Sequence, residues 1–423
     1  MNYQKEKVYF YILSTLILLS YFFGFYINED AAGGGKVDLY EHEWGNVQLF
    51  INNSIVDVLG DERYESSRTP LYLIINKYNI FASTIEGLRF SYFIFSLLIP
   101  ISFFFLLKKI YKNCDLKILF FISLIPLLSP YFRSSAFWAN QENLAIFFVI
   151  ISLIFFTEAS KQINKKNLTS SSLASLFSFL AFYSDQKMVF LVMSVYFYFI
   201  LKNNLNFFFK FSLINLIFFI PALYLFYIWG NIVPVESQFR LSTNLEGLNI
   251  LISNIGIYTL PIILVLGIKK ELKNYLKLSF LNLSILVIFS LLLLYFLPTK
   301  PEFEGNGIIF KLLSVISVKF LISFTFIKFI YFFINIIFLY FLLILFEKKV
   351  ENIIFLIIFL LIFSLTSFTY QSYVDPLFFI LIFGYFKIKN NNNLIKIELV
   401  YFFFIFYFLM LISSILFRKL III

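Results

Sequence analysis

The stretch Val8–Ile27, VYFYILSTLILLSYFFGFYI, contains no charged residue over twenty positions. A helix of about twenty apolar residues is long enough to cross a hydrocarbon core ~30 Å thick. Secretory signal peptides have shorter apolar regions of ~7–15 residues, so this stretch is typical of an uncleaved membrane helix. We therefore predict that it forms the first transmembrane span.

Comparable apolar runs recur along all 423 residues, separated by short clusters of lysine and asparagine. Hydrophobic residues make up 61% of the chain and charged residues only 14%, which leaves too little polar surface for a soluble globule. These features predict an all-α polytopic transmembrane helix bundle of about 11–13 spans, folded as a single integral membrane domain over residues 1–423. The spans after the first are expected at roughly 90–107, 118–130, 143–157, 169–184, 188–201, 211–232, 248–268, 278–297, 320–346, 353–369, 376–386 and 399–417.

Lysine and arginine are distributed unevenly between the segments that connect these spans. Segments on the side of the N-terminus hold 20 Lys and Arg residues, whereas segments on the opposite side hold 8. Cytoplasmic loops carry the excess of positive residues in membrane proteins. We therefore predict a multi-pass protein, typical of a bacterial inner membrane, with a cytoplasmic N-terminus and a first loop, residues 28–85, on the periplasmic or lumenal face.

Composition also excludes several classes of site. The chain has one cysteine, Cys114, and one histidine, His42, so it forms no internal disulfide and no site with several thiolate ligands. We expect no metal centre and no cofactor, and leave open a requirement for a divalent cation. The net charge of +10 comes from lysines at helix ends rather than from one basic patch, which favours membrane topology over nucleic-acid binding.

The first predicted outer loop concentrates the polar chemistry. Its segment Lys36–Tyr72 reads KVDLYEHEWGNVQLFINNSIVDVLGDERYESSRTPLY, and nine of the 24 carboxylates of the chain lie between Glu29 and Tyr72. A charged loop can also simply separate two membrane helices. The apolar positions have the spacing of a short amphipathic helix on the bilayer surface, namely Leu49, Phe50, Ile51, Ile55, Val56, Val58 and Leu59.

Within this loop, Asp38, Glu41 and Glu43 are the candidate catalytic carboxylates, because any of them can act as a general base. Asp38 comes first since it is closest to the end of the first span. His42 lies between the two glutamates and is a candidate for substrate binding. Two basic residues of the loop, Arg63 and Arg68, are candidates for contact with an anionic group.

Polar residues recur in the later outer loops. The candidates for substrate binding there are Arg133, Trp138, Glu142, Asp185, Lys187, Arg240, Gln371, Tyr373 and Asp375. Arg133 is the first choice for binding a phosphate, because a guanidinium donates two parallel hydrogen bonds that an ammonium cannot. Ordinary structural roles compete with these assignments. Arg133 can extend to lipid head groups, and Trp138 can be an interfacial anchor.

One substrate class suits carboxylates, arginines and aromatic rings at an outer membrane surface. A sugar carried on a polyprenyl phosphate presents a lipid tail, a phosphate and a glycosyl group at that depth. Attack on its anomeric carbon passes through an oxocarbenium-like transition state while the phosphate leaves. A carboxylate can remove the proton of the acceptor, and arginine or lysine can stabilise the leaving phosphate.

The same residues resemble a known family. An acidic residue soon after the first helix, a nearby histidine, a surface helix and then Arg68-Thr69-Pro70-Leu71-Tyr72 resemble the layout of GT-C membrane glycosyltransferases. The likeness is to protein O-mannosyltransferases and to glucosyltransferases of dolichol-linked glycans. Many of these proteins have adjacent Asp and Glu in the first loop, whereas this chain reads Asp38-Leu39-Tyr40-Glu41 and lacks a second proline beside Pro70.

The resemblance implies a glycosyltransferase that moves a sugar from a polyprenyl-phosphate-linked donor to a lipid-linked glycan or another envelope acceptor, on the periplasmic or lumenal face. Membrane lipids are the other expected partners. Two alternatives stay open, an O-antigen-type polymerase or ligase and a flippase or transporter of lipid-linked oligosaccharides. A transporter is expected to carry ionisable residues near the middle of the membrane. The predicted spans are nearly free of them apart from Lys319 and Lys328, which favours an enzyme.

Overall fold

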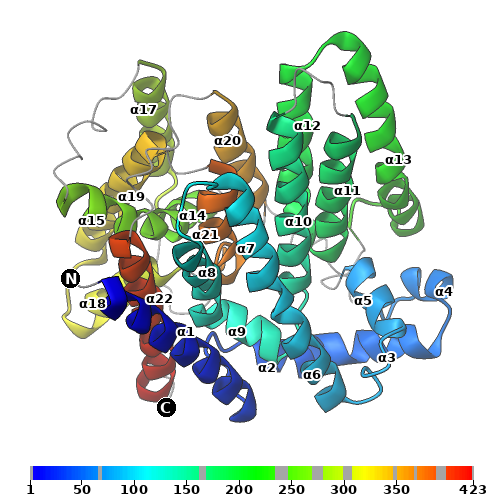
Figure 1. The fold of residues 1–423 in the computed structure, drawn as a ribbon, viewed down its shortest axis with the longest axis horizontal. Helices are drawn as coiled ribbons and strands as arrows, with labels where there is room; N and C mark the ends of the chain where they lie inside the picture. The colour runs from blue at the N-terminus through cyan, green and yellow to red at the C-terminus, as the bar shows by residue number, and fades with distance from the viewer. Residues whose placement is uncertain are drawn as a thin grey trace. The chain divides into compact units, whose positions relative to one another are not determined.

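The computed structural model describes residues 3–64, 69–161, 168–233, 246–268, 280–298, 307–345, 350–365, 369–386 and 397–421. Within these ranges all regular secondary structure is helical, which confirms the predicted all-α class (Figure 1). The chain forms two compact units. Unit 1 comprises Met1–Gln238 and Phe403–Ile423, and unit 2 comprises Phe239–Phe402. The single integral membrane domain expected over residues 1–423 stays a prediction.

Many of the helices are apolar enough to cross a membrane. Seven of those in the described ranges are also long enough, and an eighth span results if one bent pair is counted as a single crossing. The seven are Tyr9–Tyr26, Ile85–Ile110, Glu142–Lys161, Leu205–Trp229, Gly247–Ile268, Phe324–Leu345 and Ile397–Phe417. Shorter apolar helices are Leu168–Ser184, Leu283–Tyr295, Val350–Ser364 and Gln371–Phe386. The chain is therefore a multi-pass membrane protein of helical type.

Unit 1 begins with the first span and the polar loop behind it. Its elements up to the second span are α1 (Tyr3–Tyr26), α2 (Gly35–Val37), η1 (Asp38–Glu43), α3 (Trp44–Asn52), α4 (Ile55–Leu59), α5 (Pro70–Lys77), α6 (Ile85–Ser96) and α7 (Leu98–Ile110). Proline is favourable at the first position of a helix, where no backbone N–H is needed, and Pro70 occupies that position in α5. Thr84 caps α6 by accepting a hydrogen bond from the Gly87 N–H at 3.1 Å.

The predicted amphipathic helix is present as two pieces, α3 and α4. Asn53 is extended, and Ser54 starts a new helix by accepting a hydrogen bond from the Asp57 N–H, so the chain turns between the pieces. The apolar residues Phe50, Val58 and Leu59 are buried against the rest of unit 1. Lys77 ties α3 to α5, because its ammonium donates to the carbonyl oxygens of Phe50, Ile51 and Asn53 at 2.6, 3.3 and 2.7 Å.

The remainder of unit 1 is a helical bundle. It contains α8 (Leu116–Leu124), η2 (Ile125–Leu128), α9 (Pro130–Phe137), α10 (Glu142–Lys161), α11 (Leu168–Ser184), η4 (Gln186–Met188), α12 (Val189–Lys202), α13 (Leu205–Trp229) and the C-terminal part of α22 (Ile397–Ile421). The chain bends by 70° between Leu116–Leu128 and Pro130–Phe137. Ser129 is extended there because a residue before proline avoids the helical region, and its hydroxyl caps α9. The bend places α9 beside α1 and α6.

Unit 2 has its own core. Its helices are α14 (Glu246–Gly256), η6 (Ile257–Thr259), α15 (Leu260–Ile268), α17 (Phe280–Tyr295), α18 (Ile308–Lys319), α19 (Phe324–Leu345), α20 (Val350–Ser364), η7 (Gln371–Tyr373), α21 (Leu377–Leu381) and η8 (Ile382–Phe386). Gly256 allows α14 to approach α19 closely, since a Cβ at this position would lie 2.3 Å from the Phe338 side chain. Small residues permit such close packing of membrane helices.

Candidate functional site

The turn between α9 and α10 is the centre of a polar site at one end of unit 1. It runs from Trp138 to Gln141, and Ala139 has the left-handed φ of 56° that lets the chain reverse tightly. Three separate segments attach to the turn. The Trp138 indole donates to the Glu29 carbonyl oxygen at 2.9 Å, and the Asn140 amide donates to Asp38 at 3.4 Å. Gln141 accepts a hydrogen bond from the Thr69 N–H at 3.0 Å.

The three predicted catalytic carboxylates occupy different environments on η1. Asp38 is half-buried and lies beside the turn through its contact with Asn140. Glu43 is fully buried and accepts a hydrogen bond from the Tyr72 hydroxyl at 2.8 Å, while that hydroxyl also lies 2.6 Å from the Ala139 carbonyl oxygen. Glu41 is exposed. Asp38 therefore combines access with a polar neighbour on the turn. His42 is half-buried, and its carbonyl oxygen accepts from the Asn46 amide.

Two further predicted carboxylates lie near the turn. Glu142 is the first residue of α10, and the Ser135 hydroxyl donates to it at 3.4 Å. Asp185 is buried between α11 and η4, with the Lys187 ammonium 3.3 Å away. Burial raises the pKa of the Asp185 carboxyl above its usual range; Lys187 opposes the rise, and the charge of Glu142 adds to it. Asp185 therefore keeps its proton at a higher pH than an ordinary aspartate.

Arg133, the predicted phosphate ligand, is 2% exposed and makes five hydrogen bonds within unit 1. Its Nε and Nη2 donate to the two carboxylate oxygens of Glu29 at 2.7 and 2.8 Å. The other three donors reach the Ser20 hydroxyl, the Ser20 carbonyl oxygen and the Leu127 carbonyl oxygen. A guanidinium has five N–H groups. This arrangement uses all of them, so Arg133 joins α9 to the end of α1 and has no donor left for another anion.

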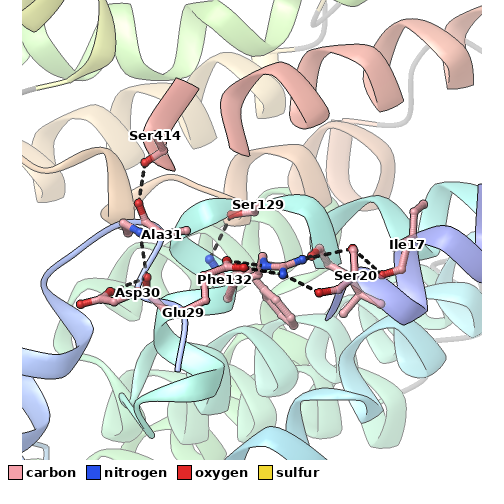
Figure 2. A network of polar contacts seen from close by, with 12 residues as sticks. Ile17, Ser20, Glu29, Asp30, Ala31, Ser129, Phe132 and Ser414 are labelled. Atoms are coloured by element: carbon pink, nitrogen blue, oxygen red, sulfur yellow. Dashed lines mark hydrogen bonds and ion pairs between the residues drawn. The ribbon is translucent and has the colours of Figure 1, made fainter. Parts of the chain in front are cut away.

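Asp30 continues this network, as Figure 2 shows. Its carboxylate accepts hydrogen bonds from the Gly33 N–H at 2.9 Å, the Lys36 N–H at 3.1 Å and the Ser134 hydroxyl at 2.8 Å. The Ser414 hydroxyl donates to the Ala31 carbonyl oxygen at 2.6 Å, so α22 also contacts the segment. These bonds shape the chain that leads from α1 to Asp38.

Arg89, which was not among the predicted site residues, is the other buried arginine of this end. It is 8% exposed on α6, and its guanidinium carbon lies 3.9 Å from the centre of the Trp138 ring. Its Nε donates to the Phe137 carbonyl oxygen at 2.9 Å, and Nη2 donates to Asn28 at 2.7 Å. Among the residues that the structure describes, no carboxylate forms an ion pair with Arg89. Its Nη1 atom bonds to none of these residues, so Arg89 retains donors for an external group.

Trp138 carries further groups on its ring. The Lys36 ammonium lies 6.0 Å from the centre of the ring, and the Tyr40 ring lies 6.4 Å from it. Both side chains are exposed. An indole face attracts cations, so Trp138 holds Arg89 in place beside a second positive charge. The nearest acidic residue along α6, Glu86, is exposed one turn away.

The other predicted residues lie elsewhere. Arg63 is 72% exposed and pairs with Asp61 at 2.6 Å, and this contact holds the pKa of Asp61 at about 2. Arg68 and Arg240 lie outside the described residues. Gln371, Tyr373 and Asp375 belong to unit 2, where Gln371 and Asp375 are buried and Tyr373 is half-buried.

Sequence reasoning had signals for the residues it did not select. Glu29 and Asp30 directly follow the first apolar run, where a chain leaving the membrane meets the polar interface. Arg89 directly precedes the apolar run predicted as the second span, and an ionisable residue in a membrane helix is a candidate for a functional site. The pairing of Arg133 with Glu29 spans more than a hundred positions and has no local signal.

Two comparisons bear on chemistry and kinship. Within the described ranges, no group of three or more His, Cys, Asp and Glu side chains is arranged to hold a metal ion. Neither family models, nor curated proteins, nor solved structures match this chain.

Proposed function

We propose that this protein is a membrane glycosyltransferase of GT-C type, which transfers a sugar from a polyprenyl-phosphate-linked donor to a lipid-linked glycan or another envelope acceptor. One observation carries the proposal. A buried arginine with spare donors, Arg89, lies at the same end of unit 1 as the half-buried carboxylate Asp38. Transfer from a sugar phosphate needs an anion-binding group and a base in one place.

The Nη1 donors of Arg89, which bond to no described residue, support an anionic ligand. A buried charge is costly unless it is paired and hydrogen-bonded. Arg89 lies near the start of Ile85–Ile110, a helix pair long and apolar enough to cross a membrane, and the phosphate of a polyprenyl lipid lies near the ends of such spans. Arg89 can bind that phosphate through Nη1 and Nη2, with Lys36 adding a second positive charge. Because the donors of Arg133 are used within the protein, the geometry favours Arg89 over the residue predicted from sequence.

The chemical step follows from these assignments. Asp38 removes the proton of the acceptor hydroxyl as its oxygen attacks the anomeric carbon of the donor. The bond between that carbon and the phosphate oxygen breaks, and the phosphate keeps the electron pair. Arg89 and Lys36 stabilise the charge that develops on it. Asn140 orients the Asp38 carboxylate, and Trp138 orients Arg89. The carboxyl groups of Glu142 and Asp185 contact hydroxyls of the sugar.

The test uses purified protein in lipid nanodiscs with a panel of polyprenyl-phosphate sugars and measures the release of polyprenyl phosphate. We expect Arg89→Lys to lower turnover at least tenfold while the melting temperature stays unchanged, because an ammonium cannot reproduce the two parallel hydrogen bonds. Arg63→Lys, at an exposed ion pair, is the matched control and should keep the parental rate. Parental turnover in Arg89→Lys would reject the phosphate assignment.

The base is tested in the same assay. Asp38→Asn should lower turnover by roughly 10²–10⁴-fold, the usual range for loss of general-base catalysis. Glu41→Gln changes an exposed carboxylate on the same short helix and should have little effect. If Asp38→Asn is fully active and Glu43→Gln is inactive, the base is Glu43. If all three variants are active, the glycosyl-transfer proposal for this site fails.

A further inference from the structure

Lysines gather where α7, α8 and α10 meet at one end of unit 1. They lie at the end of α7, in the turn to α8, at the start of α8 and at the end of α10, and they are Lys108, Lys109, Lys112, Lys117 and Lys161. Against these five lysines, residues 108–117 and 158–161 contain two carboxylates, Asp115 and Glu158. Because α7 packs against both α8 and α10, the lysines of the three helices form one positively charged cluster.

Contacts within the cluster show which charges are balanced. The Lys109 ammonium forms an ion pair with Glu158 at 2.7 Å. Lys161 donates to the Lys109 carbonyl oxygen at 2.7 Å, and the charges of Lys109 and Lys112 repel its ammonium. Lys108 and Lys112 are exposed, and neither forms an ion pair with a described residue. The cluster therefore retains positive charge that an external anion can balance.

The helix surface that leads to Lys108 is apolar. Along α6 and α7 from residue 90 to 108, the exposed residues follow one another at intervals of three or four positions, which places them on one helix face. They are Phe90, Ile94, Leu98, Ile101, Phe105 and Lys108. The Phe104 ring lies 6.1 Å from the ring of Phe120 on α8, and Phe120 is exposed as well. The two helices thus present an apolar surface that ends at the lysines.

Lys108 and Arg89 lie at opposite ends of the same membrane helix. Nineteen positions separate them within Ile85–Ile110, which corresponds to a rise of ~28 Å at about 1.5 Å per residue. This length matches a hydrocarbon core ~30 Å thick. When the helix spans the membrane, Lys108 lies at the head groups of the leaflet opposite to Arg89.

A phospholipid with an anionic head group matches both parts of this surface. Its phosphate lies at the level of the lysines, and its acyl chains lie along the apolar face of α7 and α8. A soluble anion would contact the lysines alone. We propose that Lys108, Lys112 and Lys161, together with the exposed apolar face that ends at Phe105, bind an anionic phospholipid such as phosphatidylglycerol. This site is separate from Asp38 and does not require the transfer reaction proposed above.

The test must distinguish lipid binding from membrane topology, because an excess of lysine on one side is also what orients a membrane protein. Full-length protein in detergent is incubated with equal amounts of phosphatidylglycerol and phosphatidylcholine, and native mass spectrometry counts the lipids that stay bound. The wild type should retain phosphatidylglycerol at least fivefold more often. The zwitterionic lipid has the same acyl chains, so the ratio reports recognition of the head-group charge.

Variants locate the contact. Lys108→Gln combined with Lys112→Gln should remove the preference and leave the melting temperature unchanged, because neither ammonium forms an ion pair with a described residue. Lys108→Arg combined with Lys112→Arg keeps the charge and should keep the preference. The charge-matched control is Lys202→Gln combined with Lys210→Gln, which removes two exposed lysines from α12 and α13 and should retain it.

Four results would overturn the proposal. The first is equal retention of the two lipids by the wild type. The second is an unchanged preference in the Lys108 and Lys112 glutamine variant. The third is an equal loss in the Lys202 and Lys210 variant, which would show an effect of net charge alone. The fourth is competition by the soluble head group glycerophosphoglycerol at the concentration of the lipid, because the apolar face would then play no part. Loss of turnover in Asp38→Asn with unchanged lipid retention would separate this proposal from the proposed function.

Discussion

The two buried arginines at the end of unit 1 differ in how their charge is balanced. Arg133 on α9 forms a bidentate ion pair with Glu29, and all its donors are used. Arg89 on α6 stacks on Trp138 and donates to neutral oxygens only. Burial by itself therefore does not distinguish a structural arginine from a binding one. The distinction lies in whether the protein supplies the counter-ion, and the following predictions test it.

The largest expected effect comes from breaking the ion pair between Arg133 and Glu29. Glu29→Gln removes the counter-charge and leaves Arg133 buried without a carboxylate, which typically destabilises a protein by about 3–5 kcal/mol. A thermal unfolding scan in detergent should show a markedly lower melting temperature. Replacing both residues by methionine should recover most of the loss, because the buried charge is gone as well. A Glu29→Gln variant as stable as the parent would mean that Arg133 is not held by this pair.

The next effect concerns Arg89, whose charge no described carboxylate balances. Arg89→Met removes a buried charge that no described carboxylate balances, so the melting temperature without ligand should stay the same or rise. Polyprenyl phosphate should stabilise the wild type by about 2.7 kcal/mol at ~100 times its Kd. The variant should lose this stabilisation. Equal stabilisation of both proteins would show that the lipid phosphate binds elsewhere.

A smaller effect is expected from the ring under Arg89. Trp138→Leu removes a cation–π contact of ~0.5–2 kcal/mol and a hydrogen bond to Glu29, but keeps an apolar side chain in the turn. The Kd for polyprenyl phosphate should rise severalfold, and turnover should fall less than in Arg89→Lys. Tyr40→Leu, at the exposed edge of the same ring, is a suitable control. A Trp138→Leu variant with the parental Kd would contradict the orienting role.

The smallest effect is a dependence of stability on pH that comes from the buried Asp185. Burial raises the pKa of its carboxyl more than the neighbouring Lys187 ammonium lowers it. The folded protein raises the pKa of this carboxyl above its ordinary value of 3.8. The unfolded chain therefore loses the proton first as pH rises, and the stability of the folded state falls from about that pH through the raised pKa. Asp185→Asn cannot titrate, so it should lack this part of the slope. Identical slopes in both proteins would rule out a raised pKa.

The site shows how far local patterns reach. The surface pieces α3 and α4 could be predicted as one amphipathic helix, because their apolar spacing depends on neighbours a few positions away. Sequence reasoning also selected Asp38, Trp138, Glu142 and Asp185, which gather around one turn. It placed Arg133 before Arg68 and Arg240 as the phosphate ligand and did not select Arg89. Both buried arginines, Arg133 and Arg89, lie near a predicted interface. Only long-range contacts separate them.

Length and composition alone determined that this chain is a helical membrane protein, because hydrocarbon admits only segments whose backbone hydrogen bonds close internally. The positions of the apolar runs also located the seven long helices, since about twenty apolar residues are needed for each crossing. The tertiary structure decided the division into two units and which buried polar groups are satisfied. Pairings such as Arg133 with Glu29 or Gln371 with Asn254 join positions more than a hundred residues apart. Such pairings follow from the packing of helices against one another, which the apolar pattern of a single helix does not specify.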